Sequence, residues 1–308
     1  MAEIARDIQT KSRAMGRTQT RGDRPDPRRL RWLSWLPVVP FFLYIAVFLL
    51  LPAAWAVVGA FRTPTGDFTL QNVNTLLTPE YLNAYKTSIG LSAMTALIGT
   101  VAGFFVAYAA QKDGAPGWVR TLLSTFAGVA SNFAGIPLAF AFIATLGTTG
   151  FITVFLASHG IDLYQNGFTL YSFVGLSLVY TYFQLPLMIL LISPALDGLR
   201  KEWFEAATSL GASSTVFWRR VGLPILWPSL LGAFVLLFGN AFAAYATATA
   251  LVGSQIGLVP ILIGRVTTGD FASDPQMASA LSLGMILIIS VAMVIYAVLQ
   301  QRSSKWLS

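Results

Sequence analysis

Six long stretches without Asp, Glu, Lys or Arg divide this sequence, and they constrain its fold more than any other feature. They are Trp32–Phe61, Thr87–Gln111, Thr121–Ile161, Leu163–Leu196, Val221–Gly264 and Pro275–Gln301. A helix needs about 20 mainly apolar residues to cross the core of a bilayer, and each stretch holds at least one such length. Only 11% of the residues are charged, against roughly 25% in soluble domains. We therefore expect an all-α polytopic membrane protein with six transmembrane helices.

The expected membrane domain covers residues 35–302, with spans at about 36–61, 87–110, 122–146, 170–193, 228–252 and 277–300. Two further apolar pieces are too short to cross. We expect Phe151–Ala157 to form an interfacial or re-entrant segment, and Leu258–Gly264 to form a short surface helix. The first apolar run is too long for a secretory signal and is expected to stay as an uncleaved span.

The Lys and Arg residues between the spans predict the orientation. Nine lie in residues 1–34, which are expected to be a basic, disordered arm. If this arm is cytoplasmic, 17 basic residues lie inside and three outside. Cytoplasmic loops carry the excess of Lys and Arg, so both termini, including a short tail at 303–308, are predicted to be cytoplasmic. The net charge of +7 then reflects topology, and we expect a lipid membrane and no nucleic acid as partner.

The longest predicted cytoplasmic loop, residues 197–227, has strong local signals. Good helix formers predict a helix over Arg200–Leu210, whose apolar face carries Trp203, Ala207 and Leu210. Gly211 is expected to end this helix, because glycine adopts positive φ at little steric cost. Ser213 or Ser214 can cap a second short helix. The loop is thus predicted to be a bent pair of helices.

Glu205-Ala206-Ala207, three residues, Gly211, nine residues and then Val221-Gly222-Leu223-Pro224 resemble the EAA loop of binding-protein-dependent ABC importer permeases. The family pattern has isoleucine where this chain has Val221, which is the sole departure. The position between the fourth and fifth of six spans also fits the family. The resemblance implies the type I ABC importer permease fold and a multi-pass subunit of the bacterial inner membrane.

The resemblance further implies that this EAA loop (residues 197–227) sits in a groove of a cytoplasmic ABC ATPase dimer. The residues expected to couple to it are Glu205, Ala206, Ala207, Gly211, Val221, Leu223, Pro224, Trp203, Phe217 and Trp218. Small Ala206 and Ala207 would let a partner approach closely. Glu205 is either an electrostatic anchor or a local cap. Trp218 docks, packs under the loop or lies at the lipid interface.

The chain itself is expected to carry no catalytic residue, metal or cofactor. It has no cysteine and one histidine, His159, which are too few for a metal site, and no Ser-His constellation. It also lacks a glycine-rich lysine loop for nucleotide phosphates. ATP and Mg²⁺ are therefore expected in the partner ATPase, and this chain is predicted not to be an enzyme.

Four polar residues lie within the expected spans: Asn132, Gln184, Asn240 and Tyr245. Such groups either line a solute pathway or join helices by hydrogen bonds. We favour packing for Asn132 and the pathway for the other three, because permeases of the family line their channel largely from the later spans. Gly99 and Gly103 are expected at a helix contact.

Three alternatives are an ATP-independent secondary transporter, a channel, and a non-transport scaffold or intramembrane enzyme, which would need either no docking loop or a catalytic constellation. The first usually needs ionisable residues at membrane depth, and the expected spans contain no Asp, Glu, Lys or Arg. The second would conduct without ATP.

One EAA loop corresponds to half of a pore, so the resemblance implies a second permease subunit, expected to be a homologous chain rather than another copy. It also implies an extracytoplasmic solute-binding protein. The stretches Phe238–Thr247 and Leu258–Gly264 are similar to permeases for spermidine and putrescine. A polyamine or a related small organic compound is therefore the expected solute.

Overall fold

The computed structural model describes residues 38–111, 116–268 and 274–304, with side chains up to residue 301. Within these ranges the chain is helical, without a β-strand. Six helical segments are long and apolar enough to cross a membrane: Val39–Gly59, Pro79–Gln111, Ile136–Ser158, Phe173–Asp197, Ser214–Phe242 and Pro275–Gln301. The expected all-α polytopic class is confirmed. The predicted N-terminal arm lies outside the described residues, as does most of the predicted tail.

The chain divides into two units at Trp55. The described part of the first unit holds helix α3 (Val39–Ile45), a π-helical turn at Ala46–Leu50 and the start of α4 (Leu51–Gly59). None of the residues in these three segments is buried. An apolar and mostly exposed surface of this kind is typical of a helix surrounded by lipid.

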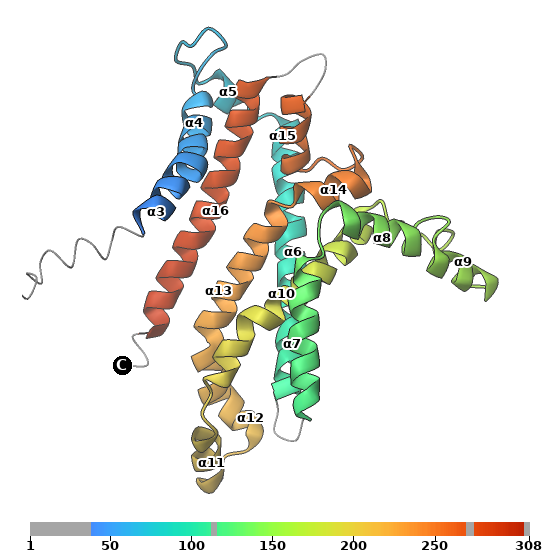
Figure 1. Cartoon of the computed structure of the whole chain (residues 1–308), viewed down its shortest axis with the longest axis vertical. Helices are drawn as coiled ribbons and strands as arrows, with labels where there is room; N and C mark the ends of the chain where they lie inside the picture. The colour runs from blue at the N-terminus through green and yellow to red at the C-terminus, as the bar shows by residue number, and fades with distance from the viewer. Residues whose placement is uncertain (1–37, 112–115, 269–273, 305–308) are drawn as a thin grey trace, which may run out of the picture. The chain divides into compact units, whose positions relative to one another are not determined.

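In the second unit, α6 (Pro79–Gln111) lies at the centre of the packing (Figure 1). It packs against α10 (Phe173–Asp197) and α13 (Leu223–Phe242). Helix α7 (Gly117–Asn132) covers α10, and α16 (Pro275–Ser304) packs on α13. The core between them consists mainly of apolar side chains, including Met188, Leu237 and Leu281, which are fully buried.

Two glycines bring α6 and α10 together. A Cβ atom at Gly99 would lie 3.0 Å from the Cβ of Gln184, and one at Gly103 would lie 2.6 Å from the Cβ of Met188. The second distance is shorter than any ordinary contact. Small residues four apart allow helix backbones to approach in this way. The helix contact predicted for this pair is confirmed.

The third span differs from the expected 122–146. Helix α7 ends at Asn132, and a new helix, α8 (Ile136–Leu146), begins after Gly135, whose φ is +74°. Glycine takes this backbone conformation without a steric penalty, so the helix breaks here. Helix α9 (Phe151–Ser158), expected as a separate short segment, follows α8 and forms with it the third segment long enough to cross a membrane; the two lead away from α7 (Figure 1).

The fifth span also differs from the expected 228–252. Helix α13 begins at Leu223, directly after a π-helical turn at Trp218–Gly222, so the helical segment is continuous from Ser214 to Phe242. It ends at Phe242, and α14 (Tyr245–Val252) starts after a short break at Ala243 and Ala244. The predicted loop and span boundaries are therefore both shifted.

Helix α15 (Val259–Thr268) was predicted as a surface helix, and that placement is wrong. Its first four residues, Val259 to Leu262, are buried, and the helix packs against α6, α14 and α16. The hydroxyl of Ser88 on α6 accepts a hydrogen bond of 2.9 Å from the Val259 N–H. An N–H at the start of a helix needs such a partner, and here another helix supplies it.

Candidate functional site

The EAA loop folds into the predicted bent pair of helices. Helix α11 covers Lys201–Ser209, and Gly211 follows with φ +79°. The N–H of Gly211 bonds to the carbonyl of Thr208, and the N–H of Ala212 bonds to that of Ala207. This pair of bonds is the Schellman motif, which ends a helix and requires a left-handed residue. The sequence signal at Gly211 is thereby confirmed.

The second helix of the loop, α12 (Ser214–Phe217), is capped as predicted. The side chain of Ser213 accepts a hydrogen bond of 3.4 Å from the Val216 N–H. A π-helical turn, η2 (Trp218–Gly222), then continues directly into α13. Of the matched family positions here, Val221 is half-buried, and Leu223 and Pro224 are exposed.

Helix α11 presents an exposed, mixed surface. Trp203 and Phe204 are 39% and 42% exposed, and Leu210 is 88% exposed. Glu205, also exposed, lies with Phe204, Thr208 and Ser209 around a shallow hollow of about 360 Å³. Ala206 is exposed and Ala207 half-buried. Exposed apolar side chains beside a carboxylate are suited to contact with a partner surface.

Of the two roles considered for Glu205, the local cap is not seen. The residue lies in the second turn of α11, and the first turn has no side-chain cap. The electrostatic anchor stays as a prediction.

Phe217 and Trp218 were expected among the docking residues, with packing under the loop as an alternative for Trp218, and both pack inward. Phe217 is 5% exposed. Trp218 is half-buried, and its ring contacts Tyr108 of α6 edge to face, with 4.8 Å between centroids. The amphipathic pattern identified the aromatic residues of the loop but not the helix that would cover them. Trp203, Phe204 and Leu210, in contrast, stay exposed.

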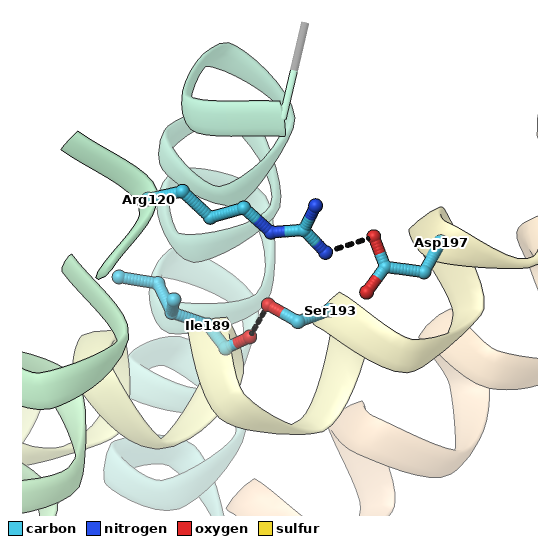
Figure 2. A network of polar contacts seen from close by, with 4 residues as sticks. All are labelled: Arg120, Ile189, Ser193 and Asp197. Atoms are coloured by element: carbon cyan, nitrogen blue, oxygen red, sulfur yellow. Dashed lines mark hydrogen bonds and ion pairs between the residues drawn. The ribbon is translucent and has the colours of Figure 1, made fainter. Parts of the chain in front are cut away.

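An ion pair lies at the start of the EAA loop (Figure 2). Arg120, in the first turn of α7, approaches the carboxylate of Asp197, the last residue of α10, at 2.5 Å. One turn earlier in α10, the Ser193 hydroxyl donates to the Ile189 carbonyl at 2.6 Å. The pair joins two helices at the point where the chain leaves the bundle.

Gln184, expected on the pathway, is fully buried between α6 and α10. Its amide nitrogen donates to the Thr95 hydroxyl at 2.6 Å, and its Oε1 has no hydrogen-bond partner among the described residues. The side chain is not accessible to a solute in this structure, so it acts as a helix-joining residue.

The other three polar span residues are exposed and lie next to the two helix breaks. Asn132 ends α7 and bonds to the carbonyl of Gly128 in its own helix, at 2.8 Å. It therefore does not join helices as expected. Asn240 lies in the last turn of α13, and Tyr245, 43% exposed, starts α14.

The two breaks are bonded to neighbouring side chains. The N–H of Gly135 donates to the Thr247 hydroxyl at 2.9 Å, which links the α7–α8 break to α14. The Tyr180 hydroxyl donates to the Ala244 carbonyl at 2.8 Å. Backbone groups freed at membrane depth need such partners. The exposed polar surface beside the breaks is uncharged, and within the described ranges no three His, Asp or Glu side chains gather as metal ligands.

No family model matches the chain. It is 24% identical to the sulfate transport system permease protein CysT of Salmonella typhimurium over 259 residues, covering 81% of this chain and 87% of that protein. It is 23% identical to the spermidine/putrescine permease protein PotB of Haemophilus influenzae, covering 85% and 92%.

Solved structures agree on the fold. A bacterial ABC transporter that imports the acidic polysaccharide alginate matches with a TM-score of 0.70 at 17% identity, covering 89% of this chain and 96% of that one. The MetNI methionine ABC transporter matches with a TM-score of 0.54 at 15% identity, covering 72% and 95%.

Proposed function

This chain is a multi-pass inner-membrane protein related to ABC permease subunits and has the fold of ABC importer transmembrane subunits; we propose that it forms one half of the solute pathway of an ATP-driven importer. In this proposal the EAA loop is cytoplasmic and docks on an ATPase that binds ATP and Mg²⁺. The chain itself hydrolyses no ATP.

The observation that carries the proposal is the shape and surface of the EAA loop. Its Schellman turn at Gly211 ends α11 and turns the chain towards α12, and α11 exposes Trp203, Phe204 and Glu205 together. An apolar surface of this kind on a short loop helix is unfavourable unless a partner covers it. The partner we propose is the ATPase dimer.

A substitution pair tests the docking. Gly211→Asp places a side chain and a charge at the positive-φ turn, and we expect it to weaken co-purification of the ATPase while the chain still inserts. Glu205→Lys reverses the charge on the exposed face and should also weaken co-purification of the ATPase. Gly160→Asp is the matched control, because Gly160 has a similar φ of +81° and open space around it, outside the EAA loop. Unchanged ATPase yield with both loop variants would refute the docking assignment.

The other proposed partners are a homologous second permease and an extracytoplasmic solute-binding protein. Support comes from a solved alginate ABC transporter that matches this fold with a TM-score of 0.71 and was determined with a periplasmic protein that had bound an alginate pentasaccharide. The solute path is proposed to pass Asn132, Asn240 and Tyr245, whose side chains are exposed beside the helix breaks.

For the solute, we propose a small charged compound, with sulfate and a polyamine as the two candidates named for relatives. The exposed polar residues at the breaks carry no charge, so they favour neither an anionic nor a cationic solute. Proteoliposomes holding the whole assembly are to be tested with labelled sulfate and labelled spermidine in parallel. Uptake of either probe without ATP would instead identify a channel or a secondary transporter.

A further inference from the structure

Five aromatic side chains connect the exposed surface of α11 to the central helix α6. We call them the aromatic wedge, and they are Phe204, Phe217, Trp218, Tyr108 and Phe104. Phe204 is partly exposed on α11, whereas Phe104 and Tyr108 pack against the main core. A continuous set of ring contacts thus runs from the proposed docking surface into the bundle.

The contacts that link the loop residues to one another and to α6 have edge-to-face geometry, whereas Phe104 and Tyr108 of α6 stack on each other. Phe204 and Phe217 have centroids 5.1 Å apart with ring planes at 89°. Phe217 and Trp218 are 6.0 Å apart at 83°. Trp218 then contacts Tyr108 at 4.8 Å and 82°, and Phe104 at 6.4 Å and 79°. Aromatic pairs prefer such arrangements, which fix relative orientation as well as distance.

Gly222 makes room for the central ring of the wedge. A Cβ atom at this buried position would lie 2.7 Å from an atom of the Trp218 indole. Trp218 and Gly222 are the first and last residues of the π-helical turn η2. Turns of this kind are rare and often occur at functional positions. The chain therefore has a π-helical turn and a buried glycine without room for a side chain at the same place, and both position Trp218 against α6.

We propose that Trp218 is a positioning residue that fixes the EAA loop to α6, so that the loop and the adjoining half of α6 move as one rigid unit when the ATPase changes shape. Because Gly99 and Gly103 hold α6 tightly against α10, such movement reaches the buried centre of the subunit. The proposal rests on the proposed function, since it needs an ATPase bound to the loop.

The test measures one distance in the assembled complex with and without a non-hydrolysable ATP analogue. The chain has no native cysteine. Spin labels can therefore be placed at Val101→Cys on α6 and Thr215→Cys on α12, both exposed and outside the wedge. Pulsed EPR on the complex in nanodiscs then reports whether α6 and the loop move together. We expect the distance to be the same with and without the nucleotide.

Three variants in the spin-labelled chain test whether Trp218 is what keeps this distance constant. Trp218→Ala removes the central ring, and Gly222→Ala displaces it while keeping the tryptophan; both should make the distance nucleotide-dependent and reduce transport per ATP hydrolysed. Trp227→Ala is the matched control, because Trp227 is a nearby tryptophan, 52% exposed, without a ring contact to the wedge among the described residues. It should behave like the parent.

If Trp218→Ala fails to assemble, the distance is measured instead in Trp218→Phe, which keeps a smaller ring, and in Gly222→Ala, which keeps the tryptophan. A nucleotide-dependent distance in the parent would overturn the proposal. So would an unchanged distance in every wedge variant that assembles. Absence of a bound ATPase in the parent preparation is a different result, visible before any distance is measured, and it would overturn the proposed function itself.

Discussion

The guanidinium of Arg120 lies 2.5 Å from the carboxylate of Asp197 and joins the first turn of α7 to the last residue of α10. The two side chains are 54% and 46% exposed. Exposed pairs of this kind contribute little, about 0.2–1 kcal/mol, because solvent screens them and long side chains lose freedom. The pair therefore defines a position at the start of the EAA loop more than it stabilises the fold.

A double-mutant cycle tests this interpretation. We expect Arg120→Gln, Asp197→Asn and the double variant to give a coupling energy of about 0.2–1 kcal/mol in thermal unfolding in detergent, and less at high salt. A coupling of about 3 kcal/mol or more, as expected for removing one partner of a buried pair, would contradict it.

Close packing of α6 on α10 predicts that Gly103→Ala destabilises the subunit. The added methyl group would lie 2.6 Å from the Cβ of Met188 and 3.0 Å from the carbonyl of Leu185. Overpacking of this kind costs about 1–3 kcal/mol of unfolding free energy.

Gly90→Ala on the same helix is the matched control. Nothing lies within 4 Å of its Cβ position, so the substitution should stabilise the helix by roughly 0.5–1 kcal/mol. Equal effects at the two positions in thermal unfolding would argue against the tight contact.

The hydrogen bond from the α7–α8 break to α14 predicts a selective effect of Thr247→Val. This change removes the acceptor of the Gly135 N–H and leaves that group unpaired, which costs about 1–3 kcal/mol. Thr247→Ser should retain most of the stability. Thr249→Val, two residues further along α14, removes a buried hydroxyl that has no partner in the described chain, and it should be neutral or stabilising. Thermal unfolding of the three variants separates these outcomes.

Accessibility to a water-soluble thiol reagent tests which polar residues face the pathway. In the assembled complex we expect Asn240→Cys and Tyr245→Cys to react, because both positions are exposed beside a break. Gln184→Cys should stay unlabelled, since that side chain is fully buried. The cysteine-free parent provides the background. Labelling at position 184, with positions 240 and 245 protected, would reverse the assignment.

Local signals in the sequence predicted the EAA loop well. Glycine at position 211 and serine at 213 act on their immediate neighbours, so a Schellman turn and a cap can be identified without knowing the rest of the fold. The span count followed from length and polarity alone.

Features that depend on packing between distant segments were missed. The apolar residues of α15 have the same composition whether they lie on a surface or, as here, against α6. The helix breaks at Gly135 and Ala244 interrupt continuous apolar sequence, and their stability depends on hydroxyls from other helices, Thr247 and Tyr180. Likewise, Phe217 and Trp218 appear as exposed aromatics until Tyr108 is placed beside them.

The most direct test of the proposed function is purification of the tagged chain from its native membrane, identification of the co-purifying proteins by mass spectrometry, and reconstitution of the assembly in liposomes. We expect an ABC ATPase and a second permease in the preparation, with uptake of the labelled solute that requires ATP. A preparation without an ATPase, or solute flux that proceeds without ATP, would contradict the proposed function.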